Sequence, residues 1–189
     1  SGDATNLAGV RWFELRQDSD GQPWSLYQEG TYASPDGKHA WNASMAMDLQ
    51  GNIGMGYSGM GGTSDQFVST YYTGRYVSDA LGTMSIAEEI IQAGTGNIGG
   101  IRFGDYSKLA VDPSNDKAFW FNNELMEGSR ANVVGVFQIA ANFANDVGVV
   151  NIDSPTSGTL TASEDVTVTI FNYGENDASN FDVTYQVDG

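Results

Sequence analysis

The sequence predicts an all-β protein assembled from short antiparallel hairpins, and three observations lead to this prediction. Apolar and polar residues alternate over short segments, which is the period of a half-buried strand. The 189 residues include 24 glycines but only 17% charged residues, a balance typical of many strands joined by glycine-rich turns. Hydrophobic residues make up 40% of the chain and aromatic residues 12%, so these strands can bury a substantial core.

Turn signals rich in Gly, Asp, Ser and Pro divide the chain into its expected strands. The first two cover residues 10–17 and 24–32, joined by the turn "DSDGQP". Further strands are expected over residues 41–49, 52–59, 67–77, 106–112, 117–125 and 132–140.

One segment, residues 85–94, departs from this pattern and predicts a short inserted helix. Its isoleucines stand near helical spacing, at positions 86, 90 and 91. Ser85 and Glu88 match a capping box, and Gly94 can end the helix. Glu88 and Glu89 could form a catalytic pair, but a capping residue with a solvated neighbour is the favoured interpretation.

A weak internal repeat relates two parts of the chain at an offset of 64 residues. Ala46-Met47-Asp48 matches Ala110-Val111-Asp112, and "GNIGMGY" falls opposite "NDKAFWF". Each unit is an apolar strand ending in Asp, a tight turn and a second strand. Two such units predict neighbouring blades of a β-propeller, although any β-meander can imitate a repeat.

The composition changes near residue 145, where Trp and Met give way to Val and Thr. "VTVTIFN" and "FDVTYQV" alternate cleanly, as in an immunoglobulin-like sandwich. We therefore expect propeller-like blades over residues 1–145, the C-terminal part of a larger propeller, and the first strands of an Ig-like module over residues 146–189. Because neither fold would be complete, the chain is expected to be a segment of a longer protein.

Charge and residue types exclude several functions. The net charge of −16, from 24 acidic and 8 basic residues, argues against binding nucleic acid or an anionic membrane. It suits a secreted protein and cation binding, although solubility alone accounts for it. The absence of cysteine excludes disulfides and thiolate chemistry, and the single His39 disfavours histidine metal sites and Ser-His-Asp triads. No apolar run is long enough to span a bilayer.

Acidic turns make calcium the candidate cofactor, because hard cations prefer several oxygen ligands. The candidate ligands are Asp18, Asp20, Asp105, Asp112 and Asp116. None of these runs matches an EF-hand, and Asp in such turns also hydrogen-bonds to the backbone without any ion.

The sequence offers three further candidate sites: a carboxylate pair, a hairpin similar to an Asp box, and a set of aromatic residues. A glycosidase-type carboxylate pair could come from Asp48, Asp105, Asp112 and Glu124, but a residue repeated in both units is more often structural. "SPDGKHAW" approaches the Asp-box hairpin of sialidases, which folds a blade and lies away from catalysis. The arginines, mostly next to aromatic residues, are expected to pack on them.

The third set is aromatic and could stack on sugars, although core packing is favoured for it. Its members are Trp12, Trp24, Trp41, Trp120, Tyr71 and Tyr72.

Several longer motifs resemble one group of bacterial proteins. They are "AGVRWFELRQ", "GTYASPDGKHAWNASMAMDLQGNIGMGYS", "YYTGRYVSDALGTM" and "RFGDYSKLAVDPSNDKAFWFNNE". Together they resemble the propeller-like region of large secreted or cell-surface proteins of marine Bacteroidetes, of the type exported by type IX secretion. The segment from Val147 resembles the start of a CARDB-type adhesion module. Phe103 stands where that group usually has Trp, a change that keeps the apolar bulk.

The resemblance implies an extracellular or cell-surface bacterial protein. The expected function is a non-catalytic adhesion or scaffold segment, stabilised by calcium; the alternative is part of a secreted hydrolase acting on polysaccharide or protein, with its active site largely elsewhere. Expected partners are other domains of the same polypeptide or other surface proteins, with carbohydrate as a further candidate. No catalytic residue is assigned.

Overall fold

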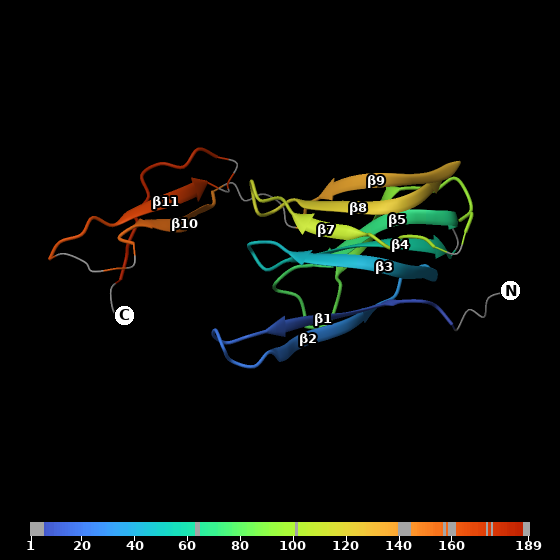
Figure 1. Ribbon diagram of the computed structural model, residues 1–189, viewed down its shortest axis with the longest axis horizontal. Helices are drawn as coiled ribbons and strands as arrows, with labels where there is room; N and C mark the ends of the chain where they lie inside the picture. The colour runs from blue at the N-terminus through green and yellow to red at the C-terminus, as the bar shows by residue number, and fades with distance from the viewer. Residues whose placement is uncertain are drawn as a thin grey trace. The chain divides into compact units, whose positions relative to one another are not determined.

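The structure, a computed structural model, confirms the all-β prediction (Figure 1). It describes residues 6–62, 65–100, 102–139, 145–156, 158, 162–172, 174 and 176–186. These residues contain eleven strands in four small antiparallel sheets and no helix. The chain divides into two compact units, Ser1–Ala140 and Ala141–Gly189, which are described separately.

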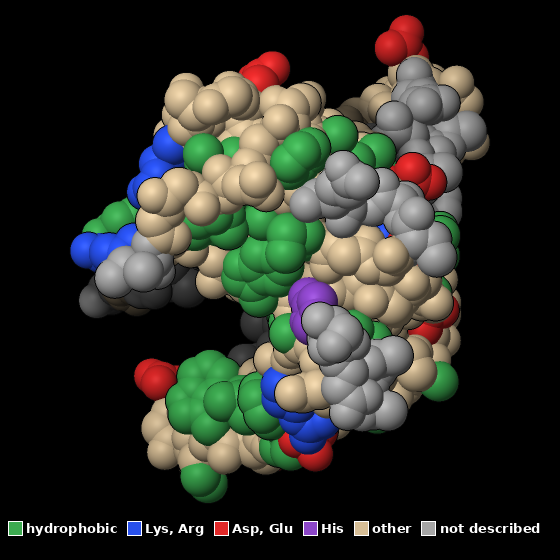
Figure 2. Space-filling view, turned by 90° about the vertical axis from the view of Figure 1, so that its right-hand side faces the viewer, with side chains coloured by type: hydrophobic (Ala, Val, Ile, Leu, Met, Phe, Trp, Pro, Cys, Tyr) green, Lys and Arg blue, Asp and Glu red, His purple; other side chains and the backbone are tan. Residues whose placement is uncertain are grey.

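The first unit begins with a two-stranded hairpin of β1 (Val10–Arg16) and β2 (Ser25–Tyr32). Trp12 of β1 is buried, and its ring packs so closely against Gly30 of β2 that a side chain there would collide with it. The space-filling view shows a hollow between this hairpin, at the bottom of that view, and the sheets above it (Figure 2). Hydrophobic side chains lie on both sides of the hollow.

Two consecutive meanders form the rest of this unit. The first contains β3 (Lys38–Met47), β4 (Ile53–Gly61), β5 (Asp65–Arg75) and β6 (Ile86–Gln92), in chain order. The second contains β7 (Lys108–Val111), β8 (Phe119–Glu127) and β9 (Ser129–Phe137).

The two meanders pack through β4 and β8, and glycines make this possible. A Cβ on Gly56 would lie 2.4 Å from the ring of Phe121, and one on Gly54 would lie 3.0 Å from the ring of Phe119. Asn123 of β8 adds a buried polar contact, because its amide donates to the hydroxyls of Ser58 and Thr70. β4 is therefore buried on both faces, which explains why its sequence lacks an apolar–polar alternation.

The hairpins containing Asp48 and Asp112 have the same local design. Each Asp ends the first strand of its hairpin, and its Oδ1 accepts backbone N–H groups of the turn that follows: Gln50 and Asn52 for Asp48, and Ser114 for Asp112. The two residues of the 64-residue repeat therefore share a turn-forming role.

The predicted helix over residues 85–94 is wrong, because most of this segment is strand β6. β6 pairs with β5, placing Ile90 opposite Tyr71. Ser85 does not cap a helix; its hydroxyl contacts Asp79. The local capping pattern is outweighed by the tertiary contacts of Glu88 and by the hydrogen bonds that β5 offers as a partner strand.

The second unit contains β10 (Val147–Ser154) and β11 (Thr167–Asn172), an antiparallel pair with two register shifts. Residues 181–186, expected to be a strand from their alternation, form none. Alternation indicates an extended chain but does not supply the neighbouring strand that a sheet requires. Across the described residues of both units, the structure has no helix that could cross a membrane.

Candidate functional site

The candidate site lies on the free face of the β7–β8–β9 sheet. Phe119 and Phe121 of β8 point toward β4, so the intervening residues point the other way. Strand pairing then places Glu124 opposite Asn132 of β9. Asn122 lies one step along the same face of β8, so three polar side chains gather on one surface.

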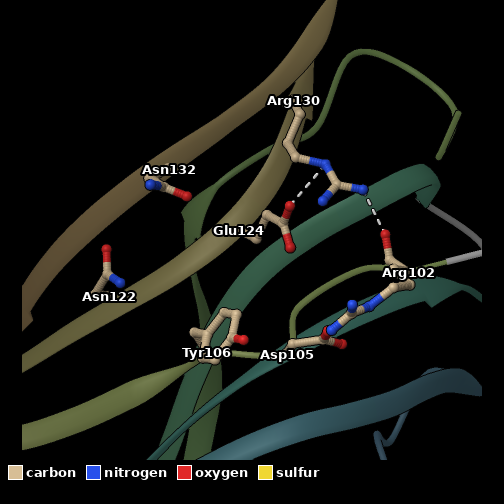
Figure 3. Close-up of a pocket in the computed structure, with 7 residues that line it drawn as sticks. All are labelled: Arg102, Asp105, Tyr106, Asn122, Glu124, Arg130 and Asn132. Carbon is tan, nitrogen blue, oxygen red and sulfur yellow. Dashed lines mark hydrogen bonds and ion pairs between the residues drawn. The ribbon is translucent and has the colours of Figure 1, made fainter. Parts of the chain in front are cut away.

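These side chains line a cavity of about 500 Å³ (Figure 3). Its seven lining residues are Arg102, Asp105, Tyr106, Asn122, Glu124, Arg130 and Asn132. We call this cavity the Arg–Asn pocket. The close-up shows the two asparagines at the left, Glu124 near the centre with Tyr106 and Asp105 below it, and the two arginines at the right.

The wall formed by residues 102–106 is held against both meanders. The backbone N–H of Gly104 donates to Oε2 of Glu124 at 2.5 Å. The amide of Asn42 on β3 donates to the carbonyl of Phe103 at 2.9 Å. Gly104 has φ +72°, and a Cβ there would collide with Asn42, so glycine is required at this position.

The charges of the pocket are paired within it. Arg130 contacts Glu124 with an Nε–Oε1 distance of 2.8 Å and also donates to the carbonyl of Arg102. Arg102 in turn pairs with Asp105, its Nε lying 2.9 Å from Oδ2. Two guanidinium groups therefore balance two carboxylates, and both oxygens of Glu124 already accept hydrogen bonds.

The chemistry of this lining suits contact with a polar ligand. It offers guanidinium, amide, carboxylate and phenol groups, which suit hydrogen bonding and ring stacking. Among the described residues that line it there is no Ser, Cys, Lys or His, and its two carboxylates are engaged by arginines. The pocket is therefore equipped to hold a polar ligand.

A second group of polar residues is buried in the first meander. The ammonium of Lys38, only 4% exposed, lies 2.7 Å from Asp36 Oδ2 and 2.5 Å from Glu88 Oε1. It also stands over the ring of Tyr71, 4.8 Å from the centroid. This ionic cluster ties β3, the first strand of the sheet, to β6, the last.

Glu88 is the centre of this cluster. Its Oε2 accepts hydrogen bonds from Tyr57 at 2.6 Å, Tyr32 at 2.8 Å and Ser34 at 2.9 Å. Burial alone would raise the pKa of Glu88, but the hydrogen bonds from Lys38, Tyr57 and the other donors outweigh it and hold that pKa below its ordinary value.

The two tyrosines of the ionic cluster remain protonated donors. Burial, together with the Glu88 carboxylate, raises the pKa of Tyr57 far above its ordinary value, and burial likewise raises the pKa of Tyr32. A phenol in this state is a poor nucleophile. The cluster is fully satisfied by its own members and is best explained as a structural link across the sheet.

The candidate calcium ligands lie in three places. Asp18 and Asp20 are exposed in the β1–β2 turn, and Asp105 is paired with Arg102 in the Arg–Asn pocket. Asp112 and Asp116 lie in the β7–β8 turn, where Asp112 also accepts from the indole of Trp120. Among the described residues, no group of three or more Asp, Glu or His side chains is arranged to hold a metal ion.

The four carboxylates weighed as a glycosidase pair separate into two kinds. Asp48 and Asp112 form turns, whereas Asp105 and Glu124 line the same Arg–Asn pocket. In "SPDGKHAW", Asp36 Oδ1 accepts from the Ser34 hydroxyl and the Lys38 N–H, so this segment is a turn joined to the ionic cluster.

The aromatic set does not form one surface. Tyr71 belongs to the core around Met55, and Tyr72 stacks on Phe137 in the core between the meanders. Trp12 is buried, while Trp24 and Trp120 are exposed. Core packing is therefore wrong for Trp24 and for Trp120, which lies on the free face of β8.

Five of the pocket residues were not identified as site residues from the sequence: Arg102, Tyr106, Asn122, Arg130 and Asn132. Arg11 and Arg16 do lie over aromatic rings, but Arg102, which was also expected to pack on one, pairs with Asp105. Arg130, which has no aromatic neighbour in the sequence, pairs with Glu124. One signal was present: in "FWFNNE", every second residue is outward-facing, which places Asn122 beside Glu124 on the free face.

Comparison with known proteins found no match: no family model, curated protein or solved structure shows significant similarity to this chain.

Proposed function

We propose that this chain is a non-catalytic adhesion or scaffold segment of a secreted or cell-surface bacterial protein, and that the Arg–Asn pocket is its ligand contact. The observation that carries the proposal is the pocket itself. It is open, it offers several hydrogen-bonding groups, and its two carboxylates are already paired with arginines. A site of this kind is suited to recognition.

The architecture is compatible with a modular scaffold. Two meanders with equivalent Asp-containing turns pack face to face through the glycines of β4, as consecutive propeller blades would. We propose that they are propeller blades, that β10 and β11 begin an Ig-like module, and that the chain resembles cargo of type IX secretion. The partners would then be neighbouring domains, other surface proteins or carbohydrate.

Retention of the labelled chain on intact bacteria and on insoluble polysaccharide tests this function. We expect the wild-type chain to be retained and Arg130→Ala, which removes the partner of Glu124, to be retained several-fold less. A matched control is Arg16→Ala, an exposed arginine that is ion-paired on β1, outside the pocket. Equal retention of the two variants would contradict the role of the pocket.

A hydrolase remains the second candidate, because Asp105 and Glu124 line one pocket. Release of reducing ends or free amines from polysaccharide and protein substrates distinguishes the two functions. We expect no release above that of a heat-denatured sample. Release that is abolished by Glu124→Gln would establish hydrolysis and overturn the non-catalytic proposal.

Calcium stabilisation is a separate proposal, motivated by the acidic turns at residues 18–20 and 112–116. If calcium binds there, an excess of chelator lowers Tm and added calcium restores it. An unchanged Tm would show that these aspartates act only as turn-forming residues.

A further inference from the structure

We infer that the Arg–Asn pocket binds a neutral, hydroxyl-rich saccharide. This inference rests on the proposed binding function and specifies its ligand. The first argument is electrostatic. Arg102 with Asp105 and Arg130 with Glu124 leave the pocket without a net charge, while the chain as a whole carries −16. An anionic ligand would meet no unpaired cation in the pocket and a repulsive field around it.

The second argument is the geometry of the hydrogen-bonding groups. Asn122 and Asn132 stand side by side on β8 and β9, and neither side chain hydrogen-bonds to another residue in the described structure. Each amide offers two donors and an acceptor in one plane. Adjacent sugar hydroxyls both donate and accept, so they can satisfy such groups, whereas an apolar ligand would leave them unpaired.

The third argument is the aromatic ring at the rim. The side chain of Tyr106 is 85% exposed, which is unusual for a group with so large an apolar surface. The C–H face of a pyranose can stack on such a ring while its hydroxyls reach the asparagines of the same pocket. Trp120, also exposed and one alternation from Asn122 on β8, can extend the contact to a further sugar unit.

The pocket is large enough for this ligand. Its volume of about 500 Å³ lies within the range of about 300–1,000 Å³ that is typical of small-molecule sites. The pocket also opens along the free face of β8 and β9, where Asn122 and Asn132 are both exposed. A chain of sugars could therefore continue beyond the bound unit.

Native affinity electrophoresis tests the inference with stated probes. The full chain is run in gels containing a neutral polysaccharide (laminarin, xylan or galactomannan) or an anionic one (alginate or polygalacturonate). We expect retardation by at least one neutral polysaccharide and none by the anionic ones. Retardation by the anionic polysaccharides alone, or by none of the five, would overturn the inference.

Variants assign the binding to the pocket. Tyr106→Ala should raise Kd about two- to tenfold, since an aromatic contact contributes roughly 0.5–1.5 kcal/mol. Asn122→Ala combined with Asn132→Ala should abolish retardation. Tyr185→Ala is the matched control, because Tyr185 is 72% exposed and does not line the pocket. If Tyr106→Ala and Tyr185→Ala bind equally, the saccharide is not bound in the Arg–Asn pocket.

The outcomes separate this inference from the proposed function. Retention on cells without retardation by any polysaccharide would support the adhesion function and contradict saccharide binding. Cleavage of the polysaccharide would contradict the proposed non-catalytic function, whichever ligand is bound.

Discussion

Gly56 lies where β4 passes closest to β8, and its missing side chain leaves room for the ring of Phe121. We expect Gly56→Ala to lower the free energy of unfolding by about 1–3 kcal/mol, because the added methyl must displace a packed ring. Chemical denaturation of the variant measures this. Gly99→Ala is the control, since a Cβ there meets nothing within 4 Å. Equal stability of the two variants would contradict the close packing of the meanders.

Lys38 offers a second test at the scale of a residue. Replacing it by Met leaves the half-buried carboxylates of Asp36 and Glu88 without their cation, so we expect a loss of about 3 kcal/mol in unfolding free energy, the low end for a broken buried ion pair. Lys108→Met, which alters an exposed lysine on β7, should change stability little. If Lys38→Met and Lys108→Met lost the same unfolding free energy, the ionic cluster would not stabilise the sheet.

The contribution of the ionic cluster should depend on pH in a defined way. The pKa of Glu88 is lowered from 4.5, so its contribution is complete above pH 4.5 and is lost as pH falls through the lower value of the folded state. Burial of Lys38 would lower its pKa, but its hydrogen bonds and ion pairs with Asp36 and Glu88 outweigh this effect, so the pKa is raised from 10.5. The contribution of Lys38 to stability is therefore complete below pH 10.5 and is lost as pH rises through the higher value of the folded state. The stability difference between wild type and Lys38→Met should therefore be largest between these limits and shrink outside them. A constant difference would contradict the ionic explanation.

At the scale of an element, most strands and turns could be predicted from the sequence, but the edge strand β6 could not. Alternation and turn residues locate the hairpins, because both are local properties. Glu88 shows the limit: its distance from Ser85 matches a capping box, but its partners Lys38, Tyr32 and Tyr57 come from strands 31 or more residues away. No local pattern predicts those contacts.

The turns of Asp48 and Asp112 share a design, but we expect them to contribute differently to the free energy of unfolding. Both residues use both carboxylate oxygens, but Asp48 is only 6% exposed whereas Asp112 is more exposed. We expect Asp48→Ala to cost about 1–3 kcal/mol, because buried N–H groups lose their acceptor, and Asp112→Ala to cost less. Urea unfolding of both variants measures the order, and the reverse order would contradict the burial of the first turn.

At the scale of the whole molecule, the function depends on surfaces that distant segments create together. The sequence indicates Asp105 and Glu124 as candidates, but it cannot show that residues 102–106 fold against β8 and β9 to form the Arg–Asn pocket. The asparagines carry no distinctive motif, and an exposed tyrosine is recognised as exposed only in the folded chain. Charge and composition, in contrast, already disfavoured nucleic acid and thiolate chemistry.

The central claim is that the chain binds a saccharide without cleaving it. Equilibrium dialysis of the full chain against laminari-, xylo- and manno-oligosaccharides, with mass spectrometry of both compartments, tests both parts at once. We predict that at least one oligosaccharide accumulates with the protein and is recovered at its original length. Equal concentrations in the two compartments, or recovery of shortened oligosaccharides, would contradict the account.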